Sequence, residues 1–185
     1  VDHDLEAVAD RLAHCLKPRH VLLRRPPDLD LRDYQRTAID AWQNAGYTGI
    51  FEMATGTGKT LTSLAAAARW VEGQQRAVVV VLAPYQHLVD QWEADLRRFG
   101  APPLKCYESA DRWMPELRAS LDRLRAGVRR FTVVVATHHT ASDERFAEIL
   151  GECDAVRENI VTIEDPVEIR LPGVTQSAVN EAKGE

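Results

Sequence analysis

The chain has 185 residues, about the length of one domain with a buried core, and its hydrophobic (45%) and charged (28%) contents are ordinary for a globular protein. The net charge of −5 argues against a protein that is basic throughout, although the pairs Arg24-Arg25, Arg97-Arg98 and Arg129-Arg130 are candidates for local contacts with nucleic acid. Three widely separated cysteines argue against a disulfide framework or a zinc site, and no apolar run approaches the length of a membrane span, so we expect a cytoplasmic protein without membrane insertion.

The first part of the chain predicts helices around one short strand. Residues 4–16 carry apolar side chains at helical spacing, and a proline-containing segment follows. Helical spacing returns over residues 31–46, which end at a glycine. A short strand is predicted over residues 48–53 and a helix over residues 61–71. The segment between this strand and this helix is rich in glycine and threonine, which predicts a tight loop.

The second part alternates strands with helices. Residues 77–83 and 131–137 are continuous apolar runs, the pattern of strands buried on both faces. The other predicted elements are a helix over 86–100, a strand over 104–109, a helix over 115–127 with Pro115 in its first turn and Gly127 at its end, a helix over 142–151 capped by Ser142 or Asp143, and a strand over 159–165. This alternation predicts a three-layer α/β domain with a mainly parallel sheet.

The strongest motif is the loop MATGTGKT at residues 53–60. Backbone N–H groups of such a loop surround phosphate oxygens, assisted by the positive end of the following helix dipole. The lysine side chain reaches the β and γ phosphates, and the last threonine hydroxyl ligates magnesium. The motif therefore predicts binding of ATP and Mg²⁺, with Lys59 also catalytic and Thr60 also a metal ligand. The predicted nucleotide-binding residues of the loop are Thr55, Gly56, Thr57, Gly58, Lys59 and Thr60.

Four blocks in the correct order over residues 31–150 resemble the first motor domain of superfamily 2 helicases, in the DEAD/DEAH-like branch that includes restriction and phage-defence helicases. The blocks are LRDYQRTAIDAW, FEMATGTGKTL, VVVVLAPYQHLVDQW and FTVVVATHHTAS. The resemblance implies a RecA-like fold, an ATPase activity and DNA as a partner. It also implies a second RecA-like domain, beyond any motif found in this sequence, and possible restriction or defence partners.

The resemblance implies roles for particular residues. Gln35 would read adenine, because its amide both donates and accepts hydrogen bonds, and Arg32 or Tyr34 would pack nearby. Residues after the two buried strands would contact phosphates of the nucleic-acid strand along which the motor moves. These residues are Pro84, Gln86, His87, Thr137 and His138. Helix capping is an equal alternative for Pro84, Gln86 and His87, and a structural role is the better interpretation of His138.

The end of the sequence departs from this pattern. No Asp-Glu-x-His or Asp-Glu-x-Asp block follows residue 150, and NIVTIEDPVE with LPGVTQSAVN resembles the acidic box of ATPases of type II secretion and type IV pilus assembly. Glu164 and Asp165 are candidate catalytic acids, and Asp165 is a candidate magnesium ligand. Because neighbouring strand residues point to opposite faces, the reversed order Glu-Asp directs each acid to the wrong face. We therefore do not expect an efficient water-activating pair.

We interpret the sequence as an N-terminal helix and proline-rich segment (1–30), a RecA-like ATP-binding domain (31–157) and a segment resembling a secretion ATPase (158–185). The chain begins with a valine and shows no second motor domain, so we expect a truncated or chimeric protein. The expected function is the front half of a DNA-dependent helicase or translocase that hydrolyses ATP slowly and does not unwind alone. The alternatives are a secretion-type motor fragment and a non-catalytic nucleotide- or DNA-binding module.

Overall fold

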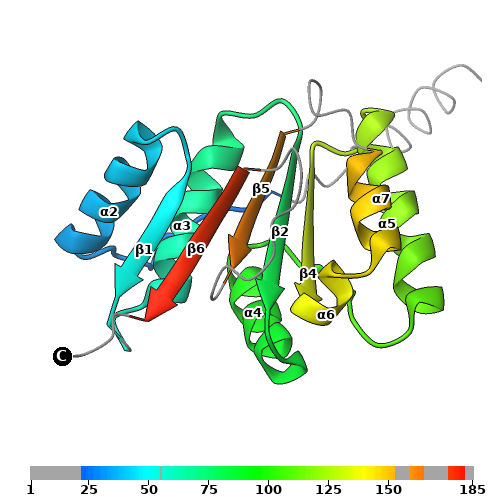
Figure 1. Ribbon diagram of the computed structural model, residues 1–185. Coiled ribbons are helices and arrows are strands. Elements are labelled where there is room, and N and C mark those ends of the chain that lie inside the picture. Colours follow the sequence, from blue (N-terminus) through cyan, green and yellow to red (C-terminus); the bar gives the residue numbers. More distant parts are fainter. Residues whose placement is uncertain (1–21, 55, 153–158, 165–174, 182–185) are drawn as a thin grey trace, which may run out of the picture.

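The computed structural model describes residues 22–54, 56–152, 159–164 and 175–181 (Figure 1). Six strands of this part of the chain form one parallel sheet in the order β1-β6-β5-β2-β4-β3. The strands are β1 (Gly49–Met53), β2 (Ala77–Ala83), β3 (Leu104–Cys106), β4 (Phe131–Thr137), β5 (Asn159–Glu164) and β6 (Thr175–Glu181). The helices are α2 (Asp33–Asn44), α3 (Lys59–Glu72), α4 (Gln86–Arg98), α5 (Ala110–Arg125), α6 (His138–Ala141) and α7 (Glu144–Gly151).

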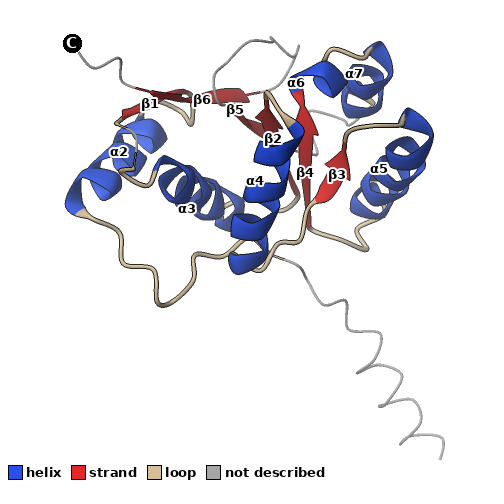
Figure 2. Ribbon diagram, turned by 90° about the horizontal axis from the view of Figure 1, so that it is seen from below, coloured by secondary structure: helices blue, strands red, loops and turns tan. Residues whose placement is uncertain are grey.

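Helices cover both faces of the sheet (Figure 2). Helices α2, α3 and α4 pack on one face, whereas α5 and α7 pack on the other. Because strand side chains alternate between faces, Val79 and Val81 of β2 join the first core and Val78 and Val80 join the second. The predicted three-layer α/β fold is confirmed. No helix in the described part of the chain is long and apolar enough to cross a membrane.

Strands β2 and β4 form the centre of the sheet and have the bounds that the sequence predicted. Every residue of both strands is buried. The two strands pair in parallel from Ala77 beside Phe131 to Ala83 beside Thr137. A strand with helices on both faces needs apolar side chains at every position, and this requirement makes such runs easy to recognise.

Strands β5 and β6 lie between β1 and β2 (Figure 1). The predicted strand at 159–165 is found as β5, and its last predicted residue lies outside the described residues. The sequence analysis did not predict β6, whose sequence TQSAVNE lacks a continuous apolar run. Strand β1, which precedes the glycine-rich loop, therefore pairs with a strand from the very end of the described chain.

The predicted start of helix α5 is wrong. The helix begins at Ala110 rather than at Pro115, which lies inside it. The proline has no N–H, so the helix loses one backbone hydrogen bond there. The earlier start places Trp113 on the buried face, where its ring packs edge-on against Phe146 at a centroid distance of 5.7 Å. Burial of this tryptophan offsets the lost hydrogen bond. The sequence prediction placed Pro115 in the first turn and did not take this burial into account.

Other boundaries also differ. The strand predicted over residues 104–109 ends at Cys106, and Glu108 adopts a left-handed conformation (φ 64°) that breaks it. The short helix α6 was not predicted. Of the two proposed caps for the next helix, Asp143 is the one used, since its side chain accepts a hydrogen bond from the N–H of Arg145. The helix predicted over residues 4–16 lies outside the described residues.

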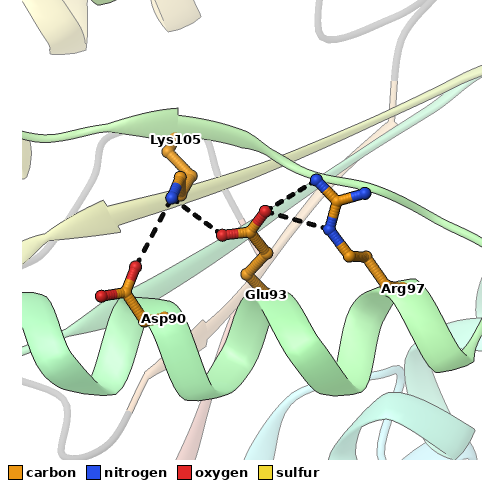
Figure 3. Close-up of polar contacts among 4 residues, drawn as sticks. All are labelled: Asp90, Glu93, Arg97 and Lys105. Carbon is orange, nitrogen blue, oxygen red and sulfur yellow. Dashed lines mark hydrogen bonds and ion pairs between the residues drawn. The ribbon is translucent and has the colours of Figure 1, made fainter.

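A network of ion pairs fastens the edge strand β3 to helix α4 (Figure 3). The Lys105 ammonium lies 2.8 Å from one Glu93 oxygen and 3.5 Å from Asp90, and Arg97 donates two hydrogen bonds to the other Glu93 oxygen. The hydrogen bond from Lys105, followed by that from Arg97, lowers the pKa of Glu93 below its ordinary value. The basic side chains at this edge thus have acidic partners within the same network.

Candidate functional site

The carboxyl ends of the parallel strands bring the predicted site residues to one edge of the sheet, here called the carboxyl edge. The glycine-rich loop follows β1, residues 84–87 follow β2, and His138 follows β4. Since Ala83 pairs with Thr137, the segments after β2 and β4 start side by side. Open parallel sheets bind ligands beyond the carboxyl ends of their strands. The predicted site residues therefore lie at the edge at which open parallel sheets bind ligands.

The glycine-rich loop takes its shape from backbone conformations that favour glycine. Gly56 and Gly58 have φ values of 79° and 83°, in the left-handed region. The Thr57 hydroxyl donates a 2.6 Å hydrogen bond to the Ala54 carbonyl, and the Thr57 N–H contacts the same oxygen at 3.3 Å. The loop is thus closed by its own hydrogen bonds. Thr55 lies outside the described residues, and its nucleotide contact stays a prediction.

The start of helix α3 fits a phosphate group. Gly58 is the N-cap and Lys59 the first helical residue, and no described side chain caps this end. The first-turn N–H groups of a helix have no intrahelical acceptor, and they lie at the positive end of its dipole. Lys59 and Thr60 stand in this first turn, half-buried. A triphosphate with Mg²⁺ fits this donor set, with Lys59 toward the phosphates and Thr60 toward the metal.

Helix α2 is held against the loop by two side chains that donate to one carbonyl. Tyr34 Oη lies 2.8 Å from the Thr57 oxygen, and Gln35 Nε2 lies 3.2 Å from it. The Gln35 Oε1 accepts a 2.9 Å hydrogen bond from the Arg32 N–H, and the Arg32 guanidinium reaches the Tyr34 oxygen at 3.2 Å. The structure therefore brings Arg32 and Gln35 to the loop.

Gln35 is only 6% exposed, and its amide already uses one donor and one acceptor position within the protein. A primary amide keeps a second N–H and further lone pairs. Its predicted contact with adenine stays a prediction, whereas its contact with the loop is observed. A Cβ at Gly58 would lie 2.9 Å from Gln35 Nε2, so the close approach of α2 to the loop requires glycine there.

The segment after β2 exposes an aromatic pair. Tyr85 is 63% exposed, and its ring lies nearly parallel to that of His87, with an interplanar angle of 8° and a centroid distance of 5.7 Å. Gln86 is exposed and Pro84 is half-buried. The contacts of Pro84, Gln86 and His87 with a nucleic-acid strand stay predictions.

The segment after β4 is more enclosed. The Thr137 hydroxyl accepts a 3.2 Å hydrogen bond from the Thr140 N–H and lies 3.0 Å from the Thr140 hydroxyl, so it caps α6. Thr137 and His138 are both buried. A capping role, raised as the alternative for the segment after β2, is thus observed at Thr137. The described residues contain no group of three or more side chains suited to bind a metal ion.

The family follows from comparison with known proteins. Residues 28–152, more than half of the chain, match the family model described as type III restriction enzyme, res subunit. The chain belongs to this family. The predicted resemblance to superfamily 2 helicases of the restriction type is confirmed. The resemblance of the last residues to secretion ATPases is not confirmed and stays a prediction.

A solved structure is also similar to this chain. It is a nuclease-deletion mutant of the Type ISP restriction-modification enzyme LlaGI in complex with a DNA substrate mimic. The identity is 20% and the TM-score 0.59, over 84% of this chain and 18% of that one. The present chain therefore spans less than a fifth of that enzyme, and the likeness shows a shared fold. No curated protein matches the chain.

In this res-family domain, Glu164 lies at the carboxyl end of β5 but points away from α3. Val161 and Ile163 pack in the core that contains α3, whereas Ile160 packs in the other core. By alternation Thr162 and Glu164 share the face of Ile160, and the Thr162 hydroxyl donates to Glu164 Oε1 at 3.2 Å. Glu164 is fully buried. Asp165 lies outside the described residues, and the catalytic and metal roles of both acids stay predictions.

Tyr85 of the res-family site was not assigned a role by sequence reasoning, whereas Tyr34 was expected to pack near Gln35. Tyr34 contacts the loop directly, and Tyr85 is the exposed ring at the carboxyl edge. Both lie next to residues that the motifs singled out, Gln35 and Gln86. A large side chain that stays exposed beside a motif would have been the signal, but its exposure can be seen only in the folded structure.

Proposed function

We propose that the chain is the ATP-binding front half of a DNA-dependent helicase or translocase. The observation that carries this proposal is the loop before α3: a left-handed Gly58 opens the helix, and Tyr34 and Gln35 hold the loop carbonyl of Thr57. This arrangement presents the first-turn N–H groups of α3 and the Lys59 side chain to one position. The family match supports a helicase-type hydrolase.

The proposed roles divide among the loop backbone, the Lys59 and Thr60 side chains, and Gln35 of α2. The backbone of the loop and Lys59 bind the β and γ phosphates, and Thr60 contributes its hydroxyl to Mg²⁺. The metal, when bound, neutralises charge that develops on the transferred phosphoryl group. Gln35 holds the loop and offers its remaining N–H and lone pair to adenine.

DNA is the proposed partner, at the carboxyl edge. Exposed Tyr85, Gln86 and His87 follow β2, beside the segment that follows β4. Helix N-termini and polar side chains bind phosphates, and aromatic rings stack on bases. The similar enzyme LlaGI was solved with a DNA substrate mimic, which supports the choice of DNA. Pro84 shapes the turn, and Thr137 and His138 support the neighbouring segment.

Hydrolysis by this chain alone is proposed to be slow. The buried Glu164 side chain lies on the face of the sheet opposite to α3, whereas the loop and Lys59 belong to α3. A water-activating acid must lie within hydrogen-bonding reach of the water it positions. A second RecA-like domain would complete the site, and restriction or defence partners would direct it. The cytoplasmic location stays a prediction.

The test measures nucleotide binding with a fluorescent ATP analogue and turnover with and without DNA. The wild type should bind the analogue in the presence of Mg²⁺ and show slow turnover that DNA increases. Lys59→Ala should abolish turnover and weaken binding, and Lys105→Ala, which removes a lysine on β3, is the matched control. No binding by the wild type would contradict the proposal.

The two alternative functions are outcomes of the same experiment. Binding without any turnover, with or without DNA, would indicate a non-catalytic nucleotide-binding module. Turnover that ignores DNA and accompanies ATP-dependent assembly of rings would indicate the secretion-type motor.

A further inference from the structure

Five arginines gather at the end of the sheet opposite to the phosphate loop. Ala77 pairs with Phe131 at the start of β2 and β4, so the segments that lead into these strands lie side by side. One segment follows α3 and the other follows α5. The two segments carry Arg76, Arg129 and Arg130, and the last turn of α5 adds Arg123 and Arg125. These five residues are here called the arginine edge.

Two of these arginines fasten the segments to each other. Arg76 Nη1 donates to the Arg125 carbonyl at 3.1 Å, and Arg130 donates to the carbonyls of Gln74 and Gln75 at 3.2 Å each. Backbone carbonyls are neutral acceptors, so these hydrogen bonds hold the guanidinium groups in place without neutralising them. The positive charges are thereby fixed at the surface.

Acidic partners are few at the arginine edge. Arg125 pairs with Asp122 at 3.2 Å and with Glu152 at 3.9 Å. Within the described part of the chain, the other four arginines form no salt bridge. By contrast, Arg97 pairs with Glu93, and Arg98 pairs with Asp28. In a chain of net charge −5, an excess of like charges in one place repels itself unless an anion compensates.

Arg123 and Arg129 are the members of the arginine edge with no structural task. The Arg129 N–H donates to the Arg123 carbonyl at 3.0 Å, which places the two residues together. Both side chains are exposed, and neither makes a hydrogen bond to another described residue. Both line one cleft of about 500 Å³, in which Glu116 is the acidic residue. A guanidinium group presents a planar fork of donors that matches a phosphate.

The cleft beside Arg123 and Arg129 also has an apolar lining that includes Pro102, Pro103 and Leu104. The positive charge of the arginine edge is therefore what favours a nucleic acid over an acidic protein. Val128, 53% exposed, is the large apolar side chain exposed among these arginines. Protein–protein interfaces bury an apolar centre, whereas interfaces with DNA are much more positively charged. We propose that the arginine edge is a second contact for the phosphate backbone of a nucleic acid, separate from the carboxyl edge. This second contact goes beyond the proposed function and does not require hydrolysis of ATP.

The test is the salt dependence of binding to a fluorescent DNA, measured for duplex and single strand. The variant Arg123→Gln/Arg129→Gln removes two charges that support no described contact. Each lost phosphate contact lowers the slope of log K against log salt by about 0.9 for duplex and about 0.7 for single strand. The slope should therefore become shallower by about two such steps, and Arg123→Lys/Arg129→Lys should retain most of the wild-type slope.

The matched control is Arg97→Gln/Arg98→Gln, which removes the same charge from arginines that have acidic partners. Its slope should equal that of the wild type. Equal slopes for wild type and Arg123→Gln/Arg129→Gln would overturn the proposal, as would an absence of DNA binding by the wild type. A polyglutamate that competes at the arginine edge while DNA does not would also overturn it, in favour of an acidic protein partner. Nucleotide binding, measured on the same variants, should be unchanged, which separates this result from failure of the proposed function.

Discussion

The two ends of the sheet differ in the groups that they offer to an anion. The carboxyl edge uses backbone N–H groups, two left-handed glycines and one lysine, held by hydrogen bonds from α2. The arginine edge uses side-chain charges that two connecting segments bring together. The first arrangement depends on the position of each atom and suits one bound group. The second depends on charge and suits a repeating polyanion.

The largest expected effect comes from Gly58→Ala, which attacks the geometry of the carboxyl edge. An alanine would have to adopt φ near 83°, and its Cβ would lie 2.9 Å from Gln35 Nε2. The strain of the left-handed conformation is about 1–2 kcal/mol, and a shift of about 1 Å in a positioned group costs on the order of a hundredfold in rate. ATP turnover should fall to that extent.

Salt-dependent DNA binding by Gly58→Ala should stay that of the wild type, because the arginine edge does not depend on the loop. An equal loss of both activities would contradict the independence of the two edges. The matched control is Gly151→Ala, at a helix end where an added Cβ meets no atom within 4 Å.

Tyr85→Ala tests whether the carboxyl edge contacts bases as well as phosphates. Stacking of a base on an aromatic side chain is worth about 1–3 kcal/mol, so affinity for single-stranded DNA should fall on the order of ten- to a hundredfold. The slope of log K against log salt should not change, because no phosphate contact is lost. Tyr85→Phe should bind as the wild type, and a changed slope in Tyr85→Ala would sink the stacking interpretation.

Gln35→Ala separates the observed contact of this side chain from its predicted role. It removes the hydrogen bonds to the Arg32 N–H and the Thr57 carbonyl, and it should lower the free energy of unfolding by about 1 kcal/mol. Affinity for the fluorescent ATP analogue should fall by about tenfold, since a loosened loop binds phosphate less well. The control is Gln91→Ala, an exposed residue of α4. Unchanged affinity would show that Gln35 neither holds the loop nor reads adenine.

The smallest expected effect is on the stability that Glu93 contributes. Glu93 pairs with Lys105 and Arg97, in contrast to the arginine edge. The lowered pKa of Glu93 means that its ion pairs stabilise the fold above the ordinary pKa of 4.5 and that this contribution is lost as pH falls through the lower folded value. Glu93→Gln should lower the free energy of unfolding at pH 7 by about 0.5–1 kcal/mol.

The difference between Glu93→Gln and the wild type should shrink below pH 4, measured by urea unfolding. Arg123→Gln/Arg129→Gln should not lower stability at either pH, because no acid in the described part of the chain pairs with these side chains. A loss of stability in this variant would mean that the arginines support the fold rather than a partner.

The sequence predicted best what depends on local pattern. Strands β2 and β4 were found with their exact bounds, because burial on both faces demands a continuous apolar run. The loop was found because its function constrains residue types at fixed spacing. The start of α5 was misjudged, because the burial of Trp113 depends on Phe146, a distant residue. Strand β6 was missed, because its central place depends on pairing with β1 and β5 rather than on its own residues.

The candidate site was predictable in part for the same reason. The motifs singled out Gln35 and Arg32 for contacts with the nucleotide, which stay predictions. The contact of Gln35 with the Thr57 carbonyl of the loop is visible only in the fold. Of the arginine edge, the sequence showed only the adjacent pair Arg129-Arg130. The approach of Arg76 requires that β2 and β4 be neighbours, which no local pattern states.

The central claim is that the phosphate loop and the arginine edge bind different ligands, and hydrogen–deuterium exchange tests it directly. ATP with Mg²⁺ should slow exchange over residues 56–62 and leave residues 123–131 unchanged. Duplex DNA without nucleotide should slow exchange over residues 123–131. The claim would be contradicted if ATP left residues 56–62 unchanged, or if DNA left the arginine edge as exposed to exchange as it is in the free protein.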